Sequence, residues 1–207
     1  MSTLKFYQKL AGKKHVTTRE AAQLTGVSVP AASMSLRRLV SEGLGTSLKR
    51  GHWLIGTTFG QPGALASAAA SPYASYLSGW SALRHHGLIQ QIPQTHFAVT
   101  LGRPGATVMP GGNVILHRLK PELFGGYSYE PRVEGFVASP EKAIFDLAYL
   151  SAMNRSRVST DLPETDLGKI RWKEVQNWLR RIPAGSIRTS VAAALERVRE
   201  RQATSAA

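Results

Sequence analysis

The clearest pattern of hydrophobic and polar positions lies between Val29 and Glu42 and has the period of an α-helix. Small and apolar residues spaced three or four apart share one narrow face of this helix: Val29, Ala32, Leu36, Leu39, Val40 and Gly43. The opposite face carries Pro30, Ala31, Met34, Ser35, Arg37, Arg38 and Ser41. It is small near its start, basic in its middle and free of acids before Glu42. A helix that enters the major groove of DNA needs this combination of little bulk and nearby cations.

A shorter helix is predicted just before it. Thr17 and Glu20 have the spacing of a capping box, and Gly26 tolerates the left-handed backbone that ends many helices. Ser28 can cap the following helix, and Pro30 is tolerated in a first helical turn. The two segments therefore predict two helices joined by a tight turn.

A basic hairpin is predicted after the second helix. Residues 44–48 and 51–55 alternate enough for two strands, and their junction reads Lys49-Arg50-Gly51-His52. A hairpin tip of this composition suits contact with a phosphate backbone or a minor groove. A first helix is predicted over residues 4–11, with Leu4, Tyr7 and either Leu10 or Ala11 facing inward. With it, residues 1–58 are predicted to form a winged helix-turn-helix. The alternative is a small three-helix core with an ordinary solvated basic face.

The rest of the chain predicts a separate α+β domain. Glycines and a proline between Gly56 and Gly63 mark the boundary. Strands are predicted at 95–101, 114–119 and 132–138, with a loop at 102–112 and another at 154–169. Helices are predicted at 64–70, from a Ser78 cap to 86, from a Ser139 cap onward, at 172–182, and from Ser186 with Ile187, Val191, Leu195 and Val198 inward. The domain, residues 64–202, is a small sheet flanked by helices, and residues 203–207 are predicted to be a disordered tail.

Charge is unevenly distributed along the 207 residues. Lys and Arg total 26 against 13 acids, giving a net charge of +13. Residues 1–58 hold nine basic and two acidic residues, a net of +7. Positive charge is therefore densest where DNA contact was predicted, which favours a polyanionic partner.

Composition excludes several other classes. The chain has no cysteine, so disulfides, thiolate catalysis and zinc ribbons are excluded. The N-terminus lacks the apolar core of a secretory signal, and no run approaches the ~18 apolar residues of a membrane helix, so we expect a cytoplasmic protein without a membrane partner. The histidines show no H-x-x-x-H spacing, and Ser81 lacks an elbow and an orienting acid. We therefore expect no metal site, no cofactor and no enzymatic activity.

Three segments of the second domain resemble a known family, and one of them, residues 93–100, looks like the strand that follows the family's first motif. Residues 76–83 read YLSGWSAL and precede His86-Gly87-Leu88, which resembles the Y-x-S-x-x-S-A-L…H-G-L signature of AbiEi-type antitoxins. Residues 138–147, ASPEKAIFDL, are similar to that family's A-x-P-E-K-A-L-x-D-L helix. Their order and spacing behind a winged helix make the resemblance specific, and it covers most of the chain.

The resemblance implies a two-domain bacterial antitoxin and autorepressor of a type IV toxin–antitoxin operon linked to abortive phage infection. The winged helix would bind inverted repeats in double-stranded operator DNA. The C-terminal domain would counteract a cognate nucleotidyltransferase-like toxin without needing a stable complex. The resemblance gives no residue a catalytic role, and it assigns DNA contact to Thr18, Arg19, Ser28, Ala31, Ser35, Arg37, Arg38, Lys49, Arg50 and His52. A regulator whose C-terminal domain binds a ligand or mediates oligomerisation stays open as the alternative.

Overall fold

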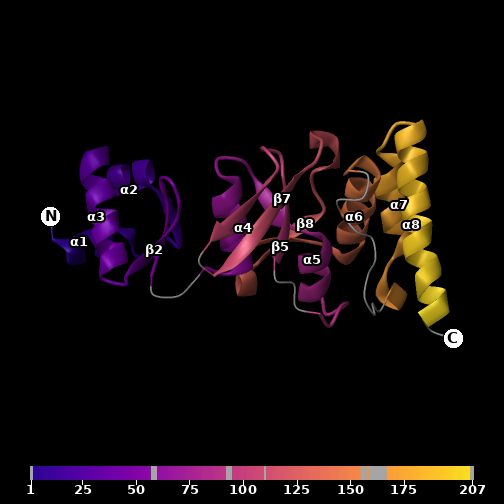
Figure 1. Ribbon diagram of the computed structural model, residues 1–207, viewed down its shortest axis with the longest axis horizontal. Coiled ribbons are helices and arrows are strands. Elements are labelled where there is room, and N and C mark those ends of the chain that lie inside the picture. The colour runs from indigo at the N-terminus through magenta and orange to yellow at the C-terminus, as the bar shows by residue number, and fades with distance from the viewer. Residues whose placement is uncertain are drawn as a thin grey trace.

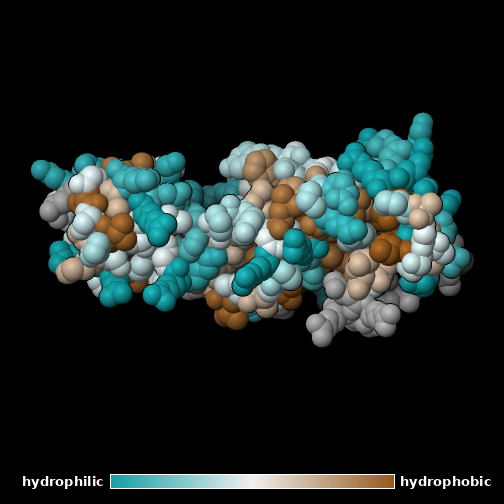
Figure 2. Space-filling view, turned by 90° about the horizontal axis from the view of Figure 1, so that it is seen from above, coloured by the Kyte–Doolittle hydropathy of each residue, from teal (hydrophilic) through white to brown (hydrophobic). Residues whose placement is uncertain are grey.

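The computed structural model describes residues 2–56, 60–91, 95–109, 111–154, 158 and 167–205, without the side chains of residues 154 and 201–205. The fold is α+β and contains a three-stranded and a six-stranded sheet. Figure 1 shows an elongated molecule with an N-terminal unit, residues 2–56, at one end and a larger C-terminal unit, residues 60–205, beside it. Polar residues cover much of the face in Figure 2, where apolar residues gather in separate clusters.

Three helices and a small antiparallel sheet form the N-terminal unit. Its elements are α1 (Thr3–Leu10), β1 (His15–Thr17), α2 (Thr18–Thr25), α3 (Val29–Ser41), β2 (Gly45–Lys49) and β3 (His52–Ile55), and the strand order is β1-β3-β2. The predicted capping box between Thr17 and Glu20 is confirmed. Gly26 has a φ of 72°, and Ser28 accepts a hydrogen bond from the Ala31 amide, so both ends of the turn are as predicted.

The core of the N-terminal unit is apolar and lies between the helices and the sheet. It includes Phe6, Leu10, Leu36 and Leu39, each at most 1% exposed. The prediction that Leu4 faces inward is wrong, since its side chain is 63% exposed. Phe6 takes the core position instead. It lies one helical turn before Leu10, so the two side chains share the face of α1 that packs on the core.

The C-terminal unit is a mixed sheet flanked by helices. Its elements are α4 (Pro62–Ala70), β4 (Ser75–Leu77), α5 (Gly79–His85), β5 (Thr95–Thr100), β6 (Gly105–Met109), β7 (Gly112–Arg118), η1 (Pro121–Leu123), β8 (Tyr127–Glu130), η2 (Pro131–Val133), β9 (Gly135–Ala138), α6 (Pro140–Asn154), η3 (Leu167–Lys169), α7 (Trp172–Arg180) and α8 (Ser186–Ser205). The strand order is β6-β7-β5-β4-β9-β8. β5 pairs parallel with β7, and β4 pairs parallel with β9; the other neighbours are antiparallel.

The sheet has more strands than predicted. β6 lies within the expected loop at 102–112, and the segment after Arg132 begins as the 3-10 helix η2 before it becomes β9. β6 and β8 are the two edge strands, and most of their residues are exposed or half-buried. The two strands are only five and four residues long, and neither has a continuous buried face, which is why the pattern missed them.

Helices cover both faces of the larger sheet. Gly112 lies beside His96 of β5 and Leu65 of α4, whereas Gly79 of α5 lies against Phe97. Because consecutive strand residues point to opposite faces, α4 and α5 lie on opposite sides of β5. The helices α7 and α8 pack on α6 at the far end of the molecule (Figure 1).

The last helices differ from the prediction at two points. α8 continues to Ser205, past the predicted start of a disordered tail at residue 203, while residues 206 and 207 lie outside the described chain. Ile187 was expected to face inward but is 39% exposed. Most of the predicted loop at 154–169 also lies outside the described residues. In the part of the chain that is described, no helix has the length and apolarity to cross a membrane.

The two units touch through the hairpin of β2 and β3. Leu48 and Leu54 belong to the same buried cluster as Leu65 and the alanines of α4. Lys14 forms an ion pair of 3.1 Å with Glu134 across the same junction. Residues 57–59 of the predicted boundary lie outside the described chain.

Candidate nucleic-acid interface

The outer face of α3 carries most of the residues predicted to contact DNA. Ala31, Arg37 and Arg38 are exposed, and Ser35 is half-buried. Met34, on the same face, is 69% exposed. Ser28 caps the helix, so its hydroxyl already accepts a hydrogen bond from the Ala31 amide. The face therefore offers small residues at Ala31 and Ser35 and two exposed guanidinium groups at Arg37 and Arg38.

The hairpin tip is fixed to the start of α2. The Thr18 amide donates to the Gly51 carbonyl at 3.0 Å, and Trp53 Nε1 donates to Thr18 Oγ1 at 2.9 Å. Gly51 has a φ of 79°, a conformation that glycine adopts without strain. Thr18 thus joins the hairpin to the helix, and Arg19 and Arg50 are exposed beside this joint. Gly51 was predicted at the hairpin tip, but the positioning role of Trp53 was not predicted.

The Lys49 side chain does not serve as a free cation of the hairpin tip, although its position in the sequence suggests that role. Its ammonium group donates a hydrogen bond of 2.7 Å to the carbonyl of Ala69, near the C-terminal end of α4. Burial lowers the pKa of Lys49. A cation at the end of a helix is favourable, because the last carbonyls carry partial negative charge. In this arrangement Lys49 ties the hairpin to the C-terminal unit, and Arg50 is the exposed cation of the tip.

His52 pairs with another histidine. Its Nδ1 lies 3.1 Å from His15 Nε2, and the two rings stack with centroids 5.3 Å apart. Burial, followed by the charge of His52, lowers the pKa of His15 to about 4. Burial and then Lys49 lower the pKa of His52. Both rings are therefore neutral at pH 7, and His52 can offer a phosphate a hydrogen bond but no charge.

In the C-terminal unit, the segments that carry the family resemblance meet around one buried carboxylate. Asp146 accepts hydrogen bonds from Tyr76 at 3.0 Å, from Ser78 at 2.7 Å and from the ammonium group of Lys142. Asp146 and Lys142 are fully buried. Ser78 was expected to cap α5, but its hydroxyl makes no cap and bonds Asp146 instead.

Burial sets the electrostatics of this cluster. It raises the pKa of Asp146 and lowers that of Lys142, and their mutual attraction opposes both shifts. Burial and then the neighbouring Asp146 raise the pKa of Tyr76, so its hydroxyl stays protonated and donates. The Lys142 ammonium also lies 4.7 Å from the centre of the Trp178 ring. The polar groups of this cluster thus bind one another inside the C-terminal unit, which fits a role in stabilising the fold.

Other motif residues join the same elements. The Ser81 hydroxyl accepts the Phe97 amide at 2.8 Å, and His86 bonds the Ala138 carbonyl at 2.8 Å. Glu141 pairs with Arg171 at 2.9 Å. Burial alone would raise the pKa of Glu141, but hydrogen bonds from Arg171 outweigh it and lower the pKa. Among the described residues, no group of three or more His, Asp and Glu could hold a metal ion.

No family model and no curated protein matches this sequence.

Proposed function

We propose that the chain is a DNA-binding antitoxin of the AbiEi type that represses its own toxin–antitoxin operon. Its N-terminal unit acts as a winged helix-turn-helix, with α3 in the major groove and the β2–β3 hairpin as the wing. Its C-terminal unit counteracts a nucleotidyltransferase-like toxin. The single observation that carries DNA binding is the outer face of α3, where exposed Ala31, Arg37 and Arg38 accompany an anchored basic tip at Arg50.

The charge and shape of the N-terminal unit support this proposal. Small residues on α3 would permit close approach to base edges, and exposed Arg37 and Arg38 would then face the phosphates that flank the groove. The bond between Thr18 and Gly51 fixes the hairpin relative to α2, so a wing and a helix would bind as one rigid surface. A solvated basic face alone would not need this joint.

The C-terminal unit supports the toxin-related part through the motif residues. Tyr76, Ser78 and Asp146 come from two segments about 70 residues apart and form one hydrogen-bonded cluster. These two segments, which carry motifs of the family resemblance, thus contact each other in the fold. Two short segments that matched the family by chance would not need to do so.

Ala31→Glu in the full chain tests the DNA-binding part. The new carboxylate would lie against the duplex, so operator affinity is expected to be lost, as measured by fluorescence anisotropy with the chain's own promoter fragment. The control is Ala193→Glu, the same change at an exposed position of α8. Retained affinity in Ala31→Glu would show that α3 does not enter the groove.

Growth rescue tests the antitoxin part separately. Cells that express the neighbouring nucleotidyltransferase-like gene product are expected to grow with the wild-type chain and equally with Ala31→Glu. Rescue lost in Ala31→Glu alone would reduce the antitoxin role to transcriptional repression. No rescue by the wild-type chain would overturn the toxin assignment and leave DNA binding standing.

A regulator that senses a small ligand is the second candidate. A pocket of about 270 Å³ in the C-terminal unit favours it. Under this candidate, the pocket ligand would change operator affinity and no toxin would be involved.

A further inference from the structure

The two edges of the larger sheet differ in how they are protected. β8 is one edge strand and ends in Glu130, whose carboxylate lies 3.7 Å from His85 Nε2. β6 is the other edge strand, and no charged residue occurs from Pro104 to Leu116. Natural sheets usually protect an open edge with charged side chains, because its backbone groups can otherwise pair with another strand. β6 is therefore the edge that is open to such pairing.

The apolar side chains beside this edge are exposed. Val108 is 81% exposed, more than any other large apolar side chain of the described residues. Ala106 lies opposite Ile115 of β7, so Ala106, Val108 and Ile115 share one face of the sheet. On that face α5 lies against Phe97, the neighbour of Ile115 in β5. Ile115 itself is 38% exposed, so the described elements leave the margin formed by β6 and β7 uncovered.

The backbone of β6 has one open side. Within the described chain it pairs with β7 alone, and the connection from Met109 to Gly112 is two residues long. The residues that flank a two-residue hairpin connection form a hydrogen-bonded pair. Alternation along the strand then directs the N–H and C=O groups of Ala106 and Val108 away from β7. These groups make no hydrogen bond with any described residue outside the strand.

We propose that β6 pairs antiparallel with β6 of a second copy of this chain. The pairing is centred on Thr107, which lies opposite its own copy at a two-fold axis. Ala106 then lies opposite Val108 of the second copy, so the open backbone groups form two equivalent hydrogen-bonded pairs. The two six-stranded sheets become continuous across the axis.

The length of β6 suits a second copy better than a longer foreign strand. β6 has five residues, and Pro104 and Pro110 stand directly before and after it in the sequence. Proline has no N–H, so neither position can extend the pairing as a donor. A second β6 has the same length and the same two limits, so the open groups of both strands are used.

Side chains and charge also suit a second copy. In the proposed pairing each Val108 lies beside the small Ala106 of the other copy, and Ile115 follows in the same row, so the apolar margin is continuous across the axis. The net charge of +13 opposes contact between copies through a charged surface. The uncharged stretch around β6 avoids that repulsion, whereas an acidic or basic partner would find no opposite charge there.

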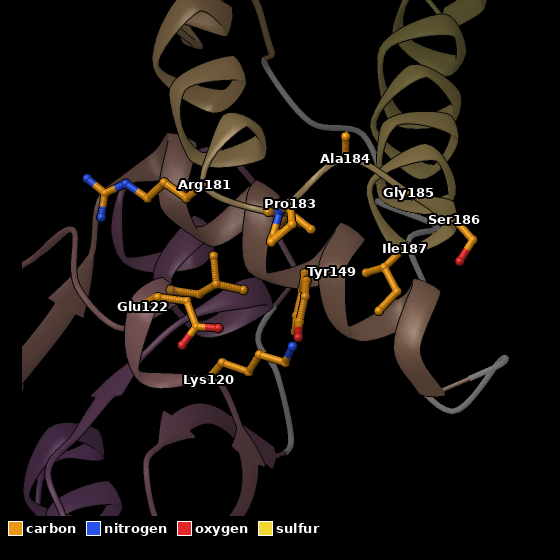
Figure 3. A pocket seen from close by; sticks show the side chains of 11 residues that line it. Lys120, Glu122, Tyr149, Arg181, Pro183, Ala184, Gly185, Ser186 and Ile187 are labelled. Carbon is orange, nitrogen blue, oxygen red and sulfur yellow. The ribbon is translucent and has the colours of Figure 1, made fainter.

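This interface is separate from the sites described above. All residues that line the pocket in Figure 3 follow Leu119 in the sequence, so none belongs to β6 or β7. The outer face of α3 belongs to the N-terminal unit. The proposed pairing therefore holds or fails independently of DNA binding, of the toxin and of a ligand in the pocket.

Sedimentation velocity of the full chain at increasing concentration, in low and high salt, tests the proposal. The average mass is expected to rise from that of the monomer toward twice that value. Each copy carries +13, so added sodium chloride is expected to strengthen the association by screening the repulsion between copies. A chain that stays monomeric throughout, that associates less in high salt, or that forms assemblies larger than a dimer would overturn the proposal.

Two matched variants locate the interface. Val108→Lys adds a cation on each side of the axis and is expected to weaken dimerisation about tenfold. Tyr129→Lys adds the same charge at an exposed position of the other edge strand, β8, and is expected to leave dimerisation unchanged. Circular dichroism confirms that both variants fold. Unchanged dimerisation in folded Val108→Lys would place the interface elsewhere and overturn the proposal.

A cysteine cross-link tests the register. The chain has no cysteine, so Thr107→Cys introduces a single thiol in each copy, opposite its counterpart on the axis. Opposite residues of a non-hydrogen-bonded pair have Cα atoms about 4.5 Å apart, which suits a disulfide. Oxidation with copper–phenanthroline is expected to give a disulfide-linked dimer, whereas Ser128→Cys, at an exposed position of β8, should stay monomeric on a non-reducing gel. Equal cross-linking of the two variants would overturn the pairing centred on Thr107.

Discussion

The two units of this protein are held together by different kinds of interaction. Among the described residues of the N-terminal unit no charged side chain is buried, and α2 and α3 begin with local side-chain caps at Thr17 and Ser28. The C-terminal unit buries Glu141, Lys142 and Asp146 to 3% exposure or less. Apolar cores and caps follow rules that are local in sequence, whereas a buried charge depends on partners far along the chain. Apolar cores and helix caps can therefore be predicted from neighbouring residues, whereas the partners of a buried charge cannot.

Asp146→Ala should have the largest effect and sharpen this contrast. It leaves the Lys142 ammonium buried without its carboxylate, so the free energy of unfolding is expected to fall by about 3–5 kcal/mol. Urea denaturation followed by circular dichroism measures the loss, and hydrogen exchange locates it. The amides of α6 and β4 should lose protection, whereas those of α2 and α3 should not.

The double variant Lys142→Met/Asp146→Leu is the control for that prediction. It removes both charges and keeps side chains of similar size, so most of the lost stability is expected to return. A double variant no more stable than Asp146→Ala would mean that packing, and not the unpaired charge, causes the loss.

The same contrast explains which parts of the structure the sequence predicted. The capping box at Thr17, the αL residue at Gly26 and the cap at Ser28 each depend on three or four neighbouring residues, and all are present. The helix starting at Pro140 and the strand at 95–100 were also predicted, since their patterns are strong.

Non-local features escaped prediction for a physical reason. Nothing near Asp146 in sequence indicates that Tyr76 and Ser78 donate hydrogen bonds to its carboxylate. Likewise, the composition of the hairpin tip does not show that the carbonyl of Ala69 accepts the Lys49 ammonium. The position of the Asp146 cluster and that of the Lys49 ammonium both depend on tertiary contacts.

Mild acid should affect both units through neutral histidines. Burial lowers the pKa of His15, in the N-terminal unit, and of His117, in the C-terminal unit, to about 4 each. In the unfolded chain these rings titrate near their ordinary pKa of 6.5, so the unfolded state binds more protons between pH 6.5 and 4. The contribution of these two histidines to the free energy of unfolding therefore has its full value above pH 6.5 and falls toward pH 4.

Urea denaturation at pH 7 and pH 5 checks this expectation. Carboxylates with lowered pKa, such as Glu20 and Glu141, lose their contribution only below their ordinary pKa of 4.5, so this window reports chiefly on histidines. His15→Gln and His117→Gln should each reduce the difference between the two pH values. A wild-type chain equally stable at pH 7 and 5 would contradict the neutral, buried state of both rings.

Thr17→Ala should have a smaller and local effect. It removes the side chain that caps α2 and accepts the Glu20 amide at 3.2 Å, which is expected to cost about 1 kcal/mol. Urea denaturation measures the loss, and Ser2→Ala, at the exposed start of α1, provides a cap variant where fraying costs less. A loss above about 3 kcal/mol would indicate that Thr17 also supports the core of the N-terminal unit.

The smallest expected effect separates two neighbouring cations at the hairpin tip. Under the proposed function, Arg50→Ala removes one phosphate contact and lowers the slope of log affinity against log salt by about one unit. Lys49→Ala should leave that slope unchanged, because the Lys49 ammonium already bonds the carbonyl of Ala69 in α4. Titrations with operator DNA at several salt concentrations compare the two variants directly. A slope lowered equally by Lys49→Ala would show that the hairpin leaves α4 when DNA binds, so that the junction between the units opens as the N-terminal unit engages the duplex.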